Sequence, residues 1–158
     1  IAVDPWFIVS SAPDKAQLIR TAREVNDAKP GWVIEKINEA VSSYQATHPQ
    51  KMLQNLKIGC LGLAFKADID DLRGSPALEI VKRVASSHPG AVLAVEPNIR
   101  ALPEGLASTV VLASLEEACE QCDIIVLLVD HKSFTAANMR FMETAHVIDT
   151  KGILNERA

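Results

Sequence analysis

From Leu56 onward, short apolar runs alternate with helical segments, and this order restricts the fold more than any other feature of the sequence. Mainly aliphatic runs with the length of strands occur at 57–64, 91–95, 109–112, 123–129 and 145–148. Runs this apolar are typical of strands that are covered on both faces. Helical patterns separate them at 75–87, at 114–121 and, more weakly, at 133–142. The alternation predicts a parallel sheet whose strands are joined by right-handed helical crossovers.

Two amphipathic helices are expected before this pattern begins. Aliphatic residues recur at helical spacing over 14–28 and again from Val33 to about Thr47, and Pro30 is expected to separate the two helices. Polar residues at 48–55 form the connection to the first strand. The predicted fold class is therefore α/β, a Rossmann-like doubly wound parallel sheet over 56–158 preceded by a two-helix linker.

Composition and charge exclude several classes of protein. The net charge is −4, and the 16 Lys and Arg are interspersed with 20 Asp and Glu, which argues against nucleic acid and anionic membrane surfaces as partners. The longest apolar run, 124–129, is much shorter than the roughly 20 residues of a membrane helix. Three cysteines and no apolar leader predict a reducing compartment, the cytoplasm. The apolar start without Met suggests a piece of a longer chain.

The loop after the first predicted strand, residues 65–74, lies where ligands bind in sheets of this type. It lacks the glycine-rich turn of a dinucleotide site, so a standard NAD site is not expected here. Lys66 at the strand tip, Arg73 before a helix N-terminus and the capping Ser75 could together bind an anion. The two cations could equally neutralise the aspartates of the same loop. Spacing alone leaves both interpretations open.

Other chemically capable residues carry weaker signals. Cys119 and Cys122 have the spacing of half a zinc site, but no second pair exists, and Cys60 is expected to be a small buried residue. No metal site is predicted. His131 follows a strand end and is expected to be polar surface. Glu96 ends the second strand, where a Rossmann acid meets ribose, but no glycine loop accompanies it.

Six stretches of the sequence resemble the UDP-glucose/GDP-mannose dehydrogenase family: 1–7, 22–27, 62–66, 70–77, 95–98 and 148–152. The strand end Phe65-Lys66 and the helix start Arg73-x-Ser75-Pro76, at this separation, are the most specific of them. The resemblance implies two Rossmann-type domains joined by a long helical segment that forms a homodimer. The first domain of the family binds NAD and the second binds the UDP-sugar.

The resemblance also implies a chemistry and a role for individual residues. The family oxidises the 6-hydroxyl of the sugar to a carboxylate in two hydride transfers, through a thioester on a cysteine expected just before Ile1. Asp4 matches an aspartate that assists proton transfer. Phe65, Lys66 and Arg73 match residues of the sugar-nucleotide pocket, and Lys151 matches a basic position near the cofactor.

By this resemblance, residues 1–55 are the end of the catalytic-loop strand plus central dimerisation helices, and 56–158 are the UDP-sugar-binding domain. The expected substrate is UDP-N-acetyl-D-mannosamine, with UDP-glucose or UDP-N-acetylglucosamine as alternatives. The chain by itself is expected to be inactive, because the NAD domain is not part of it. A non-catalytic interaction module that dimerises through 14–47 is the competing hypothesis. A receiver-like domain fits less well, because the acids that should follow the first strand are displaced.

Overall fold

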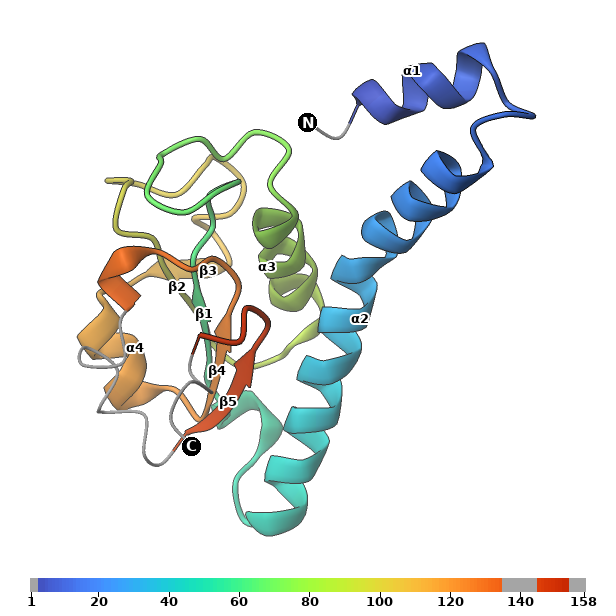
Figure 1. Ribbon diagram of the computed structural model, residues 1–158. Helices are drawn as coiled ribbons and strands as arrows, with labels where there is room; N and C mark the ends of the chain where they lie inside the picture. The colour runs from blue at the N-terminus through green and yellow to red at the C-terminus, as the bar shows by residue number, and fades with distance from the viewer. Residues whose placement is uncertain (1–2, 135–144, 154–158) are drawn as a thin grey trace.

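A five-stranded parallel sheet forms the centre of the computed structural model, which describes residues 3–134 and 145–153 (Figure 1). The strands are β1 (Ile58–Leu61), β2 (Val92–Val95), β3 (Val110–Leu112), β4 (Ile124–Leu127) and β5 (His146–Asp149). Their order in the sheet is β3-β2-β1-β4-β5, and every neighbouring pair is parallel. The chain order therefore reverses beside β1, which confirms the predicted Rossmann-like doubly wound fold.

Helices cover both faces of this sheet. The helices are α1 (Asp4–Ser11), α2 (Gln17–Thr47), α3 (Pro76–Ser87) and α4 (Leu115–Gln121), with short 3₁₀ turns at Leu53–Asn55 and Lys132–Phe134. Alternate strand residues pack on opposite sides: Cys60 joins the core under α2 and α3, whereas Leu61 joins the core under α4. All four residues of β1, of β2 and of β4 are buried, as their apolar runs predict.

Two helices begin as their sequences predict. Ser75 caps α3 by accepting a hydrogen bond from the Leu78 amide at 3.3 Å, and Pro76 occupies the first helical position. Ser114 and Glu117 form a reciprocal capping box at the start of α4. These caps fix the direction in which each crossover helix leaves the sheet.

The predicted break at Pro30 is wrong. Two helices do precede the sheet, but α2 continues from Gln17 to Thr47 with Pro30 inside it. A proline in a helix removes one backbone hydrogen bond at a typical cost of about 3 kcal/mol. Burial of Val33, Ile37 and Ala40 against the sheet offsets that cost, because most helix stability in proteins comes from packing an apolar face.

The N-terminal expectation also needs correction. Residues from Asp4 onward begin α1 rather than ending a strand, with Pro5 in the first helical turn. Proline is favoured there because its missing amide would have no partner anyway. Of the weak helix predicted at 133–142, the described residues belong to the 3₁₀ turn, and 135–144 lie outside the described residues.

The C-terminal end of α2 is fastened to the amino edge of the sheet by Asp123. One carboxylate oxygen accepts hydrogen bonds from the Tyr44 hydroxyl at 2.9 Å and from Lys51, and the other accepts the Lys57 amide at 2.9 Å. Burial alone would raise the pKa of Asp123, but these hydrogen bonds outweigh it and hold the pKa below its usual value. Within the described residues, no helix has the length and apolarity needed to cross a bilayer.

Candidate functional site

A cavity of about 710 Å³ opens between α2, the start of α3 and the carboxyl ends of β4 and β5. The switch point of the sheet, where ligands bind in open α/β folds, lies between β1 and β4. Four basic side chains contribute to the lining, namely Arg23, Lys29, Lys82 and Lys151. Two acidic residues, Asp27 and Glu79, share it. The cavity is therefore large enough for a small molecule and has an excess of positive charge.

The loop between β1 and α3 forms one wall of this cavity. Phe65 and Leu72 line it from the loop, and Gly74 and Ser75 line it at the start of α3. Gly74 has φ +65°, a left-handed conformation that suits glycine at the turn into the helix. The first turn of α3 lines this end of the cavity, and a helix N-terminus favours negative charge. An anionic group of a ligand bound here would be stabilised by the dipole of α3 and by the basic side chains of the lining.

Arg23 of α2 is the cavity residue with an unused donor. Its Nε atom is buried and has no hydrogen-bond partner among the described residues, while a terminal nitrogen binds Asp27 on the next helical turn. Lys29, also in the lining, lies with Nζ 3.7 Å from the centre of the Trp32 ring. Arg23 is thus held in place by Asp27, and its buried Nε–H remains available for a ligand oxygen.

Of the site residues that the family resemblance implies, the structure brings two to the cavity. Phe65 and Lys151 line it, and Lys151 Nζ lies 3.5 Å from an Asp130 carboxylate oxygen. Lys66, expected at the strand tip, lies exposed in the loop beyond the end of β1 at Leu61 and outside the lining. Asp4 lies exposed at the start of α1, also outside the lining.

Of the two interpretations that spacing left open for Arg73, the structure supports the second, in which Arg73 neutralises an aspartate of its own loop. Its Nε and terminal nitrogen each donate to one Asp71 carboxylate oxygen at 2.8 Å. These side-chain hydrogen bonds, with a backbone one from the Arg73 amide, lower the pKa of Asp71 to about 2. The Arg73 side chain is 91% exposed, so the pair is a surface contact that a stronger anionic ligand could displace.

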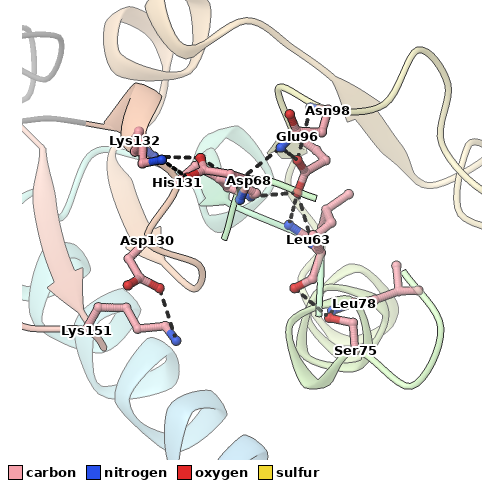
Figure 2. Close-up of polar contacts among 11 residues, drawn as sticks. Leu63, Asp68, Ser75, Leu78, Glu96, Asn98, Asp130, His131, Lys132 and Lys151 are labelled. Atoms are coloured by element: carbon pink, nitrogen blue, oxygen red, sulfur yellow. Dashed lines mark hydrogen bonds and ion pairs between the residues drawn. The ribbon is translucent and has the colours of Figure 1, made fainter. Parts of the chain in front are cut away.

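The expectation that His131 is polar surface is wrong. His131 is only 1% exposed, and its Nε2 lies 3.0 Å from a carboxylate oxygen of the buried Glu96 (Figure 2). The Asp68 amide donates to His131 Nδ1 at 2.9 Å. Because Nδ1 accepts a hydrogen bond, Nε2 carries the proton that is donated to Glu96. Asn98 contacts both members of this buried pair.

Glu96 follows β2, the position of a ribose-binding acid, but its carboxylate is used within the protein. Its Oε2 accepts the Leu63 amide at 2.8 Å and the Ala64 amide at 2.9 Å, just after β1. Amides at that point face the pyrophosphate in a dinucleotide-binding turn. Here the protein's own carboxylate satisfies them, so the residues at β1 and β2 do not fit an NAD molecule.

Sequence reasoning weighed Glu96 and His131 singly and set both aside. One signal could have paired them: β2 and β4 both flank β1, so residues just beyond their carboxyl ends meet at the same edge. The basic residues of α2 in the cavity gave no such signal, since only the packing of α2 against the sheet places them there.

The cysteines are structural. Cys60, Cys119 and Cys122 are free and buried, as expected for Cys60, and burial raises the pKa of Cys60 and of Cys122 to about 12. Across residues 3–134 and 145–153, no group of three His, Cys, Asp or Glu side chains could hold a metal ion.

Comparison with known proteins agrees with the geometry of the site. Residues 59–156 match the model of the UDP-glucose/GDP-mannose dehydrogenase family, UDP binding domain. The chain is 51% identical over 153 residues, 97% of its length, to the UDP-N-acetyl-D-mannosamine dehydrogenase of Escherichia coli K12. It is 48% identical over the same share of its length to an NDP-N-acetyl-D-galactosaminuronic acid dehydrogenase of Ralstonia solanacearum. It spans only about a third of these relatives, 36% and 34% of their length.

Solved structures give the same result. A UDP-D-ManNAc dehydrogenase from Pyrococcus horikoshii aligns with a TM-score of 0.76 and 30% identity, covering 98% of this chain and 34% of that one. The UDP-N-acetyl-mannosamine dehydrogenase of S. aureus aligns with a TM-score of 0.71 and 27% identity, over 98% and 34% of the two chains. The chain therefore belongs to the UDP-glucose/GDP-mannose dehydrogenase family, and the part of it that matches is the UDP-binding domain.

Proposed function

We propose that this chain binds the UDP portion of a sugar nucleotide as part of an NAD-dependent UDP-sugar 6-dehydrogenase. The observation that carries the proposal is the match of residues 59–156 to a UDP-binding domain, together with a basic cavity at the switch point of the sheet. A diphosphate carries compact negative charge, which the start of α3 and the surrounding cations complement.

Individual residues have distinct roles in this proposal. Phe65 packs against the nucleotide from the β1–α3 loop, and Lys66 and Arg73 approach the diphosphate from the rim of the same loop. Arg73 exchanges Asp71 for phosphate oxygens, which it can bind with the same two-pronged geometry. Lys151 lines the cavity from the other side, after β5, and is assigned to the cofactor side of the site.

The complete reaction needs more protein than these residues supply. NAD carries away the hydride when bound, and the β1 and β2 ends described above do not fit it, so we assign NAD to a part of the enzyme outside the described domain. Asp4, on α1, is proposed to assist proton transfer there. The 158-residue chain alone is expected to reduce no NAD, because no acceptor is held against the sugar.

The proposed sugar is N-acetyl-D-mannosamine. The support is the 51% identity to an enzyme named for that substrate, while the 48% identity to a galactosaminuronic acid enzyme keeps 2-acetamido sugars as the wider class. A cytoplasmic location is proposed because the three thiols are free, as in a reducing compartment. The proposed role in surface-polysaccharide synthesis rests on the family resemblance.

Titration calorimetry with UDP tests the proposal on three proteins. The unaltered chain should bind UDP, and Lys66→Ala should bind about 10-fold more weakly, since a hydrogen bond to a charged group contributes about 1.5 kcal/mol or more. Lys57→Ala is the matched control, because Lys57 bonds Gln121 at the opposite edge of the sheet. Equal affinities of the Lys66 variant and the unaltered chain would remove Lys66 from the site.

A second part of the proposal concerns association. Exposed apolar side chains gather on α1 and the first half of α2, with Phe7 65%, Leu18 83% and Val25 67% exposed. Apolar exposure of this extent favours a protein contact, and we assign it to a homodimer through residues 14–47. Sedimentation of a Leu18→Glu/Val25→Glu variant tests this, since an unchanged association state would contradict it. Val111→Glu, at a 58% exposed position on β3 outside this segment, is the control.

A further inference from the structure

We propose that Glu96 and His131 are positioning residues, a buried pair that holds the β1–α3 loop in the conformation that receives the nucleotide. The inference rests on the proposed function and deepens it, because neither side chain lines the cavity and both act through the loop. The segment concerned is residues 63–68, which carries Phe65 and Lys66 between two anchored ends.

Glu96 anchors the first end of the segment. Its side chain is fully buried, and its Oε2 accepts the amides of Leu63 and Ala64 as well as the His131 proton. The other oxygen, Oε1, accepts the Asn98 amide at 3.2 Å. A buried carboxylate is costly to desolvate, and here several donors converge on it. The position of this charge therefore depends on the loop having this backbone conformation.

His131 anchors the second end. Its Nδ1 accepts the Asp68 amide at 2.9 Å, and Asp68 Oδ1 in return accepts the Lys132 amide at 3.0 Å (Figure 2). Asp68 has φ +60°, and among described residues other than glycine it alone has a positive φ. A non-glycine residue persists in that conformation when its surroundings over-determine it. The hydrogen bonds that the Asp68 amide donates to His131 and that its carboxylate accepts from Lys132 hold Asp68 in this conformation.

A third contact fixes the segment to the cavity. The Ser75 hydroxyl, at the cap of α3, donates to the Ala64 carbonyl at 3.2 Å, and the Phe65 amide donates to the Asp71 carbonyl at 2.9 Å. Residues 65–67 therefore lie between two fixed points: the buried Glu96–His131 pair, and the start of α3, which lines the cavity. A change at Glu96 or His131 would be transmitted to the position of Phe65.

The loop, rather than the core, is the element these polar groups organise. Apolar residues of similar volume often stabilise a core as well as a buried, hydrogen-bonded polar pair does, so the pair is not needed for burial alone. Every amide that Glu96 and His131 accept lies in the loop after β1 or in the turn after β2. We infer that the pair specifies loop geometry.

Three substitutions separate positioning from general stability. Glu96→Gln keeps the size but places an NH₂ group against N–H donors. His131→Gln can still donate to Glu96 near the position of Nε2 but leaves the Asp68 amide without its acceptor, whereas His131→Asn can place an oxygen near Nδ1 and keep it. Tyr44→Phe is the control, because it removes a hydrogen bond to Asp123 at the opposite edge of the sheet.

Two measurements on the full 158-residue chain are needed: amide hydrogen exchange at residues 63–68 and calorimetric affinity for UDP. Glu96→Gln and His131→Gln should exchange faster at these amides and bind UDP about 10-fold or more weakly, as expected from losing one or two hydrogen bonds. His131→Asn and Tyr44→Phe should keep slow exchange at Asp68 and bind UDP within about 3-fold of the unaltered chain.

The outcomes distinguish this inference from the proposed function. If the unaltered chain does not bind UDP, the proposed function fails, whatever the exchange data show. If it binds, and Glu96→Gln or His131→Gln exchanges faster at the loop yet binds equally well, the positioning inference is overturned. It is also overturned if Tyr44→Phe weakens UDP binding as much as His131→Gln does, since the effect would then be general stability.

Discussion

Replacement of Gly62 by alanine should destabilise this fold more than the same replacement at Gly74. Both glycines have a positive φ, +92° at Gly62 and +65° at Gly74. An added Cβ at Gly74 meets no atom within 4 Å, whereas at Gly62 it would lie 2.9 Å from the Val129 backbone nitrogen and overlap the Val129 side chain. Comparing the two alanine variants therefore separates the free-energy cost of positive φ from the cost of the steric overlap with Val129.

The expected magnitudes follow from these two terms. Alanine at positive φ costs about 1–2 kcal/mol, which applies to both positions. Overpacking of a buried site adds about 1–3 kcal/mol at Gly62 only, because Val129 belongs to the core and cannot move freely. Reduced freedom of the unfolded chain offsets both variants equally and cancels in the comparison. The difference in unfolding free energy should thus be about 1–3 kcal/mol.

Urea unfolding measures this difference in free energy, and thermal unfolding gives the corresponding midpoints, both followed by circular dichroism. Gly62→Ala should have a thermal midpoint roughly 2–12 °C below that of Gly74→Ala, at about 2–4 °C per kcal/mol for a chain of this size. Equal losses in the two variants would refute the argument that contact with Val129 closes the end of β1. A Gly62→Ala protein with normal stability would refute the positive φ as well.

Three further outcomes are expected. A pH titration by NMR should find the Asp71 carboxyl protonating near pH 2, so the Arg73 contact persists above that and is lost as the pH falls towards it; Arg73→Ala should return the midpoint towards the usual aspartate value. The three cysteines should resist a thiol reagent at pH 8 until the chain is unfolded, since burial raises the pKa of each thiol. Tyr44→Phe should lower the unfolding free energy by about 1 kcal/mol, measured in urea, because Asp123 keeps its other partners.

Local patterns were sufficient to predict the order of elements, because apolar runs and caps act over a few residues. The ends of the strands needed tertiary information. The sequence contains no polar residue from Ile58 to Ala64, yet β1 stops at Leu61, because Gly62 turns to positive φ and the Leu61 carbonyl accepts the amides of Leu128 and Val129. The prediction of a helix break at Pro30 failed for the same reason. The proline does cost local helix stability, but packing of α2 against strands that are distant in the sequence outweighs that cost.

The site was predicted in part, and the division has a physical cause. The family motifs identify the loop 65–74 correctly as the element at the switch point, but they carry no information about which side chains turn inward. His131 looked like surface because its partner Glu96 is 35 residues away along the chain and meets it only when β2 and β4 flank β1. For Arg73 the spacing left two interpretations open, and the structure pairs it with Asp71 two residues earlier.

The use of Glu96 also bears on which side of the sheet edge a nucleotide approaches. In a dinucleotide-binding turn, amides after the first strand face the phosphates and the acid after the second strand faces ribose. Here the Glu96 carboxylate accepts the amides that follow β1. The amides that would have bound phosphate and the acid that would have bound ribose therefore bind each other within the protein. Donors that remain for a ligand are then those towards α2, where Arg23 Nε has no partner in the described residues and Lys151 lines the cavity. A nucleotide bound on that side would contact α2 as well as the domain, which would couple ligand binding to the long helix proposed to form the dimer.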